Sequence, residues 1–358
     1  MKIGIPRETK ILEGRVGLIP VACSHLVAQG HEVFVQQDAG LNSGYSNEDY
    51  TRVGASIMPD AAALYAAAEL IVKVKEPTEQ DLIHLRKEHV LFCYLHLAAN
   101  TGLIQQLCNI GLTAVAFETV TDDHGGLPCL APMSEIAGSL AIQIGANLLH
   151  QPQGGRGILL GGLPLTGRGH VVVLGAGKAG GTAAKLAADM GAIVTVFDKN
   201  RERLEILHQS APNIITLYPY QDSITKALQT ADLLVGAVLL PGLNTPRLVS
   251  AAQVKSMPSG SVIIDISIDQ GGCIETIHAT DYANPTYTVD EVLHFGVTNM
   301  PGAVPRTASQ ALSAVIMPYV LRLCEPGWEL QDDLLHGINV RAGRVDNPLI
   351  AQALLAAS

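Results

Sequence analysis

A glycine-rich turn between two apolar runs restricts the fold of this chain more than any other feature. A Val-rich run leads into Gly175, Gly177 and Gly180, which have the spacing G-x-G-x-x-G. An Ala- and Leu-rich segment follows, and a second apolar run, 192–197, ends at Asp198. Strand, glycine turn, helix, strand and terminal acid in this order predict a dinucleotide-binding βαβ unit.

Each residue of this unit has a physical role. Gly175 permits the tight turn, Gly177 lets the backbone approach a pyrophosphate, and Gly180 lets the helix pack closely on the strand. The helix begins near Lys178, where free N–H groups and the helix dipole favour phosphate. We expect Asp198 to accept hydrogen bonds from the adenosine ribose and to repel a 2′-phosphate, so the predicted cofactor is NAD.

Length and composition narrow the class of protein. A chain of 358 residues predicts two domains, because a single compact core rarely grows that large. Hydrophobic residues make up 48% of the chain and aromatic residues 4%, which is typical of buried parallel sheets under closely packed helices. The formal net charge of −10 argues against nucleic acid as the main partner, because a phosphate-backbone binder needs a basic surface.

The cysteines and the apolar runs indicate a cytoplasmic protein without a metal site. The cysteines lie far apart with no C-x-x-C pair, which favours buried thiols in a reducing compartment: Cys23, Cys93, Cys108, Cys129, Cys273 and Cys324. We see no signal-type apolar region at the start and no apolar run as long as a membrane span.

Alternating apolar and helical segments predict two parallel sheets covered by helices on both faces. In the first third, the strand candidates are 2–5, 32–36, 70–75, 90–96 and 113–118, and the helix candidates are 21–29 and 60–68. From the strand before the glycine turn onward, we expect six strands in a doubly wound pattern, at 171–175, 192–197, 214–218, 232–238, 261–267 and 295–299.

Two long helical segments, 132–149 and 307–323, enter and leave the nucleotide-binding region, and a polar tail follows the second. The predicted fold is therefore α/β, with two doubly wound domains joined by two long helices. Residues 131–305 are expected to form an NAD-binding Rossmann domain, and residues 1–130 and 306–358 a discontinuous substrate domain. The cleft between two such domains is a usual place for a ligand.

Polar residues at the carboxyl ends of strands are the candidates for chemistry, because ligands of open α/β sheets lie there. Lys75 binds a carboxylate or is a solvated strand end, and His96 is an acid/base or a satisfied core residue. Asp269 and Asn299 face a cofactor or serve only as turn residues. Arg15, in a polar loop, binds a carboxylate through its planar guanidinium or lies on the surface.

Several longer motifs resemble one enzyme family. The segments GIPRETKILEGRVGLIP, YLHLA, LAPMSEIAG, VVVLGAGKAG, DISIDQGGC and NMPGAVPRTASQAL resemble those of bacterial L-alanine dehydrogenases in order and spacing. The resemblance extends from residue 1 to about 328. It implies NAD-dependent, reversible oxidative deamination of L-alanine to pyruvate and ammonium by a homo-oligomer, often a hexamer.

The resemblance also implies roles for individual residues. Arg15 and Lys75 are the implied ligands of the substrate carboxylate, and His96 is the implied catalytic acid/base. Asp269 is implied as a second essential group, acting on His96 or on the nicotinamide ribose. The implied cofactor contacts lie in six short segments: Ser134; Gly175, Gly177, Lys178, Ala179 and Gly180; Asp198 and Arg203; Val238 and Leu239; Ile266, Ser267, Ile268 and Asp269; and Val297, Thr298, Asn299 and Met300.

The chain departs from the family pattern at three places. Tyr218-Pro219-Tyr220 stands where a cofactor-contacting serine is expected, His278 stands in place of an arginine, and the segment from Glu329 onward has no family match. Two other functions stay open: a related amino-acid dehydrogenase of the same family, and a catalytically silent NAD(H)-binding protein.

Overall fold

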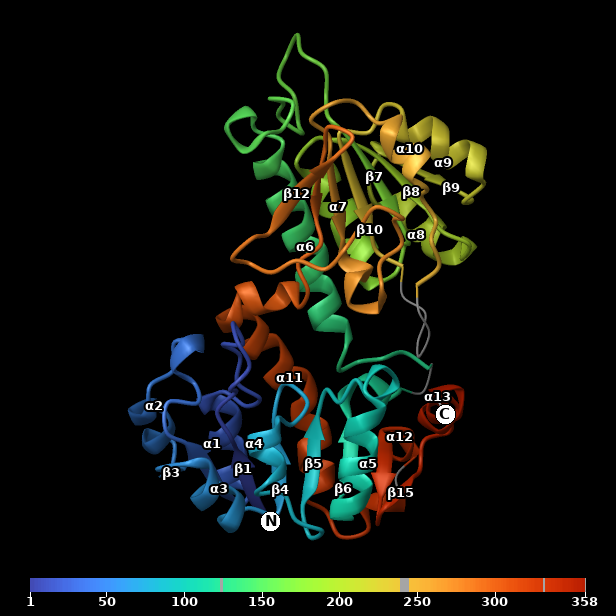
Figure 1. The fold of residues 1–358 in the computed structure, drawn as a ribbon. Coiled ribbons are helices and arrows are strands. Elements are labelled where there is room, and N and C mark those ends of the chain that lie inside the picture. The colour runs from blue at the N-terminus through green and yellow to red at the C-terminus, as the bar shows by residue number, and fades with distance from the viewer. Residues whose placement is uncertain (123–124, 239–244, 331, 358) are drawn as a thin grey trace. The chain divides into compact units, whose positions relative to one another are not determined.

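The computed structural model describes residues 1–122, 125–238, 245–330 and 332–357 (Figure 1). The chain divides into two compact α/β units: Met1–Met133 with Gly302–Ser358, and Ser134–Pro301. It enters the second unit within α6 (Ala131–Leu148) and leaves it within the 3-10 turn η6 (Met300–Ala303), just before α11 (Pro305–Leu323). The predicted α/β class with two sheets is confirmed.

The sheet of the first unit has eight strands among the described residues, in the order β15-β14-β6-β5-β4-β1-β2-β3. Strands β1 to β6 run parallel, whereas β14 runs antiparallel to β6 and to β15. Most of their side chains are buried, as expected of a parallel sheet covered on both faces. The strands are β1 (Lys2–Ile5), β2 (Glu32–Gln36), β3 (Ser56–Met58), β4 (Leu70–Val72), β5 (Val90–Cys93), β6 (Thr113–Ala116), β14 (Ile338–Arg341) and β15 (Arg344–Val345).

Several helices of the first unit, among them those at Ala61–Ala67 and Thr101–Ile110, begin after residues whose side chains cap them. Asp60 accepts a hydrogen bond from the N–H of Ala63 (2.8 Å), and Asn100 from that of Leu103 (3.2 Å). The helices are α1 (Pro20–Ala28), α2 (Asn47–Arg52), α3 (Ala61–Ala67), α4 (Glu79–Leu82), α5 (Thr101–Ile110), α12 (Asp332–Leu335) and α13 (Pro348–Ala357), with 3-10 turns η1 (Leu41–Ser43), η2 (Leu97–Ala99), η3 (Phe117–Thr119) and η7 (Trp328–Leu330).

The segment after α11 is not the polar tail that the sequence predicted. Strand β14 pairs with β6, with Ile338 opposite Val115 and Val340 opposite Ala114. Val340 and Ile350 are buried in the same core as α5, and Figure 1 shows the red β15 and α13 beside the teal β6 and α5. The prediction failed because it overlooked the apolar helix Pro348–Ala357, and because β14 pairs with a strand distant in the sequence, which no local pattern reveals.

The sheet of the second unit has seven strands within the described ranges, in the order β12-β13-β11-β10-β7-β8-β9. Six run parallel, and the edge strand β12 is antiparallel to β13. The strand order reverses on either side of β7, so the carboxyl end of β7 is a topological switch point, where ligands of such sheets bind. The strands are β7 (His170–Leu174), β8 (Ile193–Phe197), β9 (Ile214–Leu217), β10 (Leu233–Gly236), β11 (Val262–Asp265), β12 (Thr286–Val289) and β13 (Val292–Phe295).

Helices flank these strands in Figure 1: α7 (Lys178–Asp189), α8 (Arg201–Ser210), α9 (Gln221–Leu228) and α10 (Ala251–Lys255). Two 3-10 turns, η4 (Gln151–Gln153) and η5 (Ile266–Gln270), belong to the same unit.

Several predicted strand bounds were wrong. The strands predicted at 90–96, 113–118, 232–238 and 261–267 end earlier, at Cys93, Ala116, Gly236 and Asp265. Strand β4 ends at Val72 and not at residue 75, because the buried apolar run continues beyond the regular ladder. The strand predicted at 295–299 lies at Val292–Phe295 (β13), and strands β3 and β12 were missed. The polar residue His294 interrupts the apolar run of β13, although the structure buries His294 fully and its ring forms hydrogen bonds.

Candidate functional site

The glycine turn of the second unit has the geometry that a dinucleotide requires. Gly175 has a φ of +100°, a conformation that favours glycine, and a Cβ on Gly180 would overlap the carbonyl oxygen of Gly175. Gly177 precedes α7, and the nearest neighbouring atom to a Cβ there is Nη1 of Arg203, at 4.0 Å. The backbone at Gly177 is therefore open to a ligand at the N-terminus of α7.

Asp198 lies at the carboxyl end of β8 and is tied to this turn. Its Oδ2 accepts a hydrogen bond from the N–H of Ala176 (2.6 Å), and its Oδ1 from that of Asn200 (2.7 Å). The carboxylate is half-buried. It therefore places a negative charge beside the glycine turn, where an adenosine ribose would lie.

A cavity of about 310 Å³ opens beside the glycine turn. Three of its charged side chains are basic, namely Lys178, Lys185 and Arg203, and one is acidic, Glu135. Lys178 and Glu135 are 3.8 Å apart. The excess of positive charge suits an anionic ligand. Ser134 precedes Glu135 in α6, and a Cβ on Gly138 of the same helix would overlap the carbonyl oxygen of Ala179.

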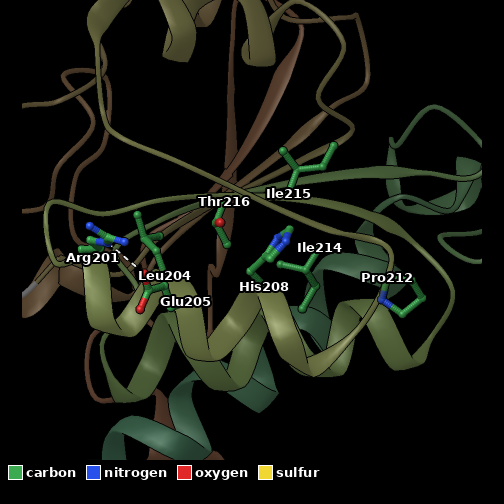
Figure 2. Close-up of a pocket in the computed structure, with 8 residues that line it drawn as sticks. All are labelled: Arg201, Leu204, Glu205, His208, Pro212, Ile214, Ile215 and Thr216. Carbon is green, nitrogen blue, oxygen red and sulfur yellow. Dashed lines mark hydrogen bonds and ion pairs between the residues drawn. The ribbon is translucent and has the colours of Figure 1, made fainter.

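A larger cavity of about 490 Å³ lies between α8 and the edge strand β9 (Figure 2). Its lining residues Arg201 and Glu205 form an exposed ion pair at 2.8 Å. None of the predicted site residues lines it, so we place no function there.

A buried carboxylate organises the loop that follows β11. Asp265 accepts hydrogen bonds from the N–H groups of Ser267 (2.9 Å), Cys273 (2.7 Å) and Ile274 (3.3 Å). Burial raises the pKa of Asp265, although these hydrogen bonds lower it in part. Ser267 in turn accepts a hydrogen bond from the N–H of Val238 (2.9 Å), which joins this loop to the end of β10.

The same loop presents Asp269 to solvent, next to the segment after β13. Oδ1 of Asp269 accepts a hydrogen bond from the N–H of Asn299 (3.3 Å), and Asn299 has a left-handed φ of +56°. The other predicted residues of these two segments divide into buried ones (Ile268, Val297, Met300), a half-buried one (Ile266) and an exposed one (Thr298). The predicted contact Leu239 lies outside the described residues.

In the first unit, Arg15 is buried and held by Glu13. Its Nε donates to Glu13 at 2.6 Å, its Nη2 also pairs with Glu13, and its Nη1 lies 3.3 Å from the Sδ atom of Met133. Burial alone lowers the pKa of Arg15, but the Glu13 carboxylate outweighs it and raises the pKa. The Nε and Nη2 edge of the guanidinium is thus occupied by Glu13.

Lys75 is half-buried just beyond the end of β4, and a carboxylate holds its backbone. Oε1 of Glu8 accepts hydrogen bonds from the N–H groups of Val74 (2.7 Å) and Lys75 (3.4 Å). The neighbouring Lys73 is fully buried, 3.5 Å from Glu8 and 3.2 Å from Asp81.

The carboxylate of Glu76 lies within electrostatic range of Lys75 and of His96. It forms an ion pair with Lys10. Burial raises the pKa of Glu76, but its hydrogen bond to Lys10 and the nearby charges of Lys75, His96 and Lys10 lower it overall.

His96 is exposed, which excludes its interpretation as a core residue. Its ring stacks on that of Tyr94, with centroids 5.9 Å apart and an interplanar angle of 18°. Tyr94 also lies within electrostatic range of Arg15. Tyr94 is thus near both the predicted carboxylate ligand and the predicted acid/base.

The sequence did not single out three carboxylates of this site: Glu8, Glu13 and Glu118. Glu118 accepts hydrogen bonds from the N–H groups of Leu95 and His96. It follows β6 directly, so the strand-end criterion that selected Lys75 and His96 also applies to it. Glu8 and Glu13 lie in the same polar loop as Arg15, which was a weaker signal.

Two of the three departures from the family pattern, at 218–220 and at His278, lie in the second unit, whereas the segment from Glu329 onward belongs to the first. Tyr218 and Tyr220 are exposed, with their rings 4.8 Å apart. His278 stacks on Tyr287 at 3.7 Å between centroids.

The remaining expectations concern membranes, metals and thiols. No helix within the described residues is long and apolar enough to cross a membrane. In the same ranges, no group of three or more His, Cys, Asp and Glu side chains is arranged to hold a metal ion. All six cysteines are free thiols, and four of them are buried.

Known proteins resemble this chain along its whole length, so the expectation that the segment from Glu329 onward has no family match was wrong. Residues 4–137 match the family model "Alanine dehydrogenase/PNT, N-terminal domain", and residues 141–348 match "Alanine dehydrogenase/PNT, C-terminal domain". The alanine dehydrogenase of Bacillus subtilis (strain 168) is 46% identical, with 99% of this chain and 95% of the relative covered. That of Halomonas elongata is 44% identical, with 99% and 96% covered.

A solved structure of an L-alanine dehydrogenase superposes with a TM-score of 0.94 at 46% identity, covering 100% of both chains. A transhydrogenase from Sinorhizobium meliloti shares the fold, with a TM-score of 0.85 at 23% identity over 97% of this chain and 99% of the other. The chain therefore belongs to the alanine dehydrogenase/PNT family.

Proposed function

We propose that this protein catalyses the NAD-dependent, reversible oxidative deamination of L-alanine to pyruvate and ammonium. The observation that carries the proposal is the end-to-end identity of 46% with an alanine dehydrogenase. The side chains gathered at the strand ends of the first unit give it a chemical basis.

The first unit supplies the groups that would hold the substrate and accept a proton from the attacking water. Arg15 and Lys75 would bind the carboxylate of alanine through their positive charges. Fixing the carboxylate fixes the Cα hydrogen, and most of the gain in rate is positional. His96, in its neutral form, would take a proton from the attacking water and later assist the loss of ammonia.

The second unit supplies the groups that fit a nicotinamide dinucleotide. The open backbone at Gly177, the N-terminus of α7 and the basic cavity suit the diphosphate, and Asp198 suits a ribose without a 2′-phosphate. When bound, the cofactor supplies the hydride acceptor at its nicotinamide ring. Asp269 is proposed as the second essential group, and its hydrogen bond to the N–H of Asn299 fixes it at the edge of its loop.

We further propose a homo-oligomer, a hexamer by resemblance, in the cytoplasm. Three leucines in the segment after α6 are exposed to solvent: Leu159, Leu163 and Leu165. Exposed apolar side chains of this kind support self-association, because contact with another copy of the chain would bury them. The free thiols support a reducing compartment. Light scattering coupled to size-exclusion chromatography tests the assembly.

A steady-state screen tests the activity. NADH formation is measured with L-alanine, L-serine and 2-aminobutyrate, and NADH consumption with pyruvate or glyoxylate in the presence of ammonium. We expect alanine and pyruvate to give the highest kcat/KM. Preference for another amino acid indicates a related dehydrogenase, and NADH binding without turnover indicates a silent NAD(H)-binding protein.

A further inference from the structure

The backbone at His96 is held by a carboxylate to which the proposed mechanism gives no role. Oε1 of Glu118 accepts hydrogen bonds from the N–H of His96 (2.6 Å) and of Leu95 (3.0 Å), and its Oε2 lies 3.2 Å from the same nitrogen of Leu95. Glu118 lies in η3 directly after β6, and His96 lies after β5. The two strands are paired, with Cys93 opposite Ala116, so their ends are neighbours.

His96 needs this support because its backbone adopts an unfavourable conformation. Its φ of 49° and ψ of 35° lie in the left-handed region, which is disfavoured for a residue with a Cβ. Such a conformation persists only where its surroundings over-determine it. Two successive N–H groups that donate to one carboxylate are a strong constraint, because hydrogen bonds to an ionised acceptor are stronger than neutral ones.

Tyr94 constrains the imidazole ring of His96 separately. The ring of Tyr94 stacks on that of His96, its hydroxyl donates to the carbonyl oxygen of Cys129 (2.6 Å), and its edge meets Phe117 at 4.9 Å between centroids. Phe117 is the residue before Glu118. A single short segment after β6 thus supports both the backbone and, through Tyr94, the ring of His96.

We propose that Glu118 is a positioning residue for the reaction, which fixes the turn that directs His96 toward the substrate. The inference rests on the proposed function of His96. Glu118 acts through the backbone N–H groups of Leu95 and His96 and touches no reacting atom. A carboxylate suits this place, because Oε1 accepts from both N–H groups and Oε2 lies 3.2 Å from the nitrogen of Leu95, where the NH2 group of an amide would set a donor against a donor.

The variant Glu118→Gln tests this role, because an amide keeps one acceptor oxygen and replaces the other with a donor. We expect kcat for alanine to fall roughly 10- to 100-fold, since small misplacements of a reacting group have effects of that size. The KM for alanine and the Kd for NADH should stay within about twofold, since binding groups are unchanged.

Glu69→Gln is the matched control. Glu69 also accepts a backbone hydrogen bond in the same sheet, from the N–H of Lys2 at 2.8 Å, but it lies at the amino ends of the strands. Its substitution should leave kcat unchanged. Should Glu118→Gln fail to fold, Glu118→Asp withdraws the carboxylate by one methylene and should lower kcat in the same way.

A double-mutant cycle separates positioning from general structure. In a His96→Ala background, Glu118→Gln should change the residual rate by less than about twofold, because a residue that acts through His96 has nothing left to position. The imidazole resonances of His96, identified by their loss in His96→Ala, should shift in Glu118→Gln and not in Glu69→Gln. This readout needs neither cofactor nor turnover.

A wild-type kcat in Glu118→Gln, unmoved His96 resonances, or an additive loss in the His96→Ala background would each overturn the proposal. The failure of the proposed function looks different. In that case the wild-type protein forms no NADH from alanine, while the resonances of His96 still report whether Glu118 controls its orientation.

Discussion

The ammonium group of Lys73 lies 3.2 Å from Oδ2 of Asp81, and the two side chains are 0% and 6% exposed. Glu8, 3.5 Å away on the other side of Lys73, completes a buried cluster of one cation and two carboxylates. Burial alone would lower the pKa of Lys73, but Glu8 and Asp81 raise it overall, so the lysine is charged. The cluster lies directly before Lys75, whose backbone Glu8 also holds.

Lys73→Met should lower the free energy of unfolding by about 3–5 kcal/mol, because it leaves two buried carboxylates without their cation. Urea unfolding at neutral pH measures this. Lys87→Met is the control, because Lys87 pairs with Glu88 at 3.7 Å on the surface, and exposed pairs contribute about 0–1 kcal/mol. Equal losses in the two variants would contradict the assignment.

Asp81 should also give the stability a dependence on acid pH. Burial raises its pKa, but Lys73 and the hydrogen bonds of Thr78 and Tyr65 lower it below the ordinary value of 3.8. A carboxyl whose pKa is lowered on folding stabilises the protein above its unfolded pKa and loses this effect as the pH falls through its folded pKa. Asp81→Asn should therefore be less stable than the wild type at pH 7, and the difference should shrink below about pH 4.

His96→Ala should still bind NADH with near-normal affinity yet lose kcat by about two to four orders of magnitude, the usual contribution of a general acid/base. NADH fluorescence titration and steady-state rates measure the two effects. His208→Ala, in the exposed cavity of Figure 2, is the control and should keep full activity. If His96→Ala keeps more than a few per cent of the wild-type activity, His96 is not the general acid/base.

Asp198→Asn should reduce the preference for NAD over NADP, because it removes a negative charge from the position beside the ribose while the amide oxygen still accepts from Ala176. We expect a change in the ratio of kcat/KM values on the order of 10- to 100-fold, as for like charges several ångströms apart. Asp222→Asn, an exposed carboxylate in α9, should leave the ratio unchanged. Equal use of both cofactors by the wild type would refute the role of Asp198.

Asp265→Asn should disorganise the loop that carries Asp269. The amide presents a donor where three backbone N–H groups converge, so we expect the free energy of unfolding to fall by about 1–3 kcal/mol. The Kd for NADH should rise with it. Asp281→Asn is matched, since Asp281 accepts two backbone hydrogen bonds at 2.9 Å in an exposed turn of the same unit. If NADH binds normally to Asp265→Asn, the loop does not contribute to the cofactor site.

The sequence predicted the glycine-turn region of the fold well because its signals are local. Strands β7 and β8 and helix α7 lie where the apolar runs and glycines place them, since each residue of the motif fixes its own backbone. The predicted strand bounds were wrong where buried apolar residues continue beyond the hydrogen-bonded ladder, as after β4. They were also wrong where a polar residue is buried within a strand, as His294 is in β13. The last strands could not be predicted, because their partner β6 is remote in sequence.

The candidate site was only partly predictable for a related reason. Lys75, His96, Asp269 and Asn299 were found because they follow apolar runs. The carboxylates that hold the backbone at Lys75 and His96 lie in other segments. Glu8 is 66 residues from Val74, and Glu118 is 22 residues from His96. Sequence spacing does not reveal such contacts, and the strained backbone of His96 has no signature in its side chain.

Strand β14 pairs with β6 but is synthesised long after it, so this part of the sheet can be completed only late in translation. The ribosome makes β6 early, then all of the second unit, and only afterwards β14. At about 5–20 residues per second, the second unit is complete and able to fold while β6 still lacks its neighbour on that side. An unpaired edge strand is a template for wrong association. The nascent chain is therefore most exposed to misfolding at the edge of β6, and a chaperone that shields one strand edge would protect it during translation.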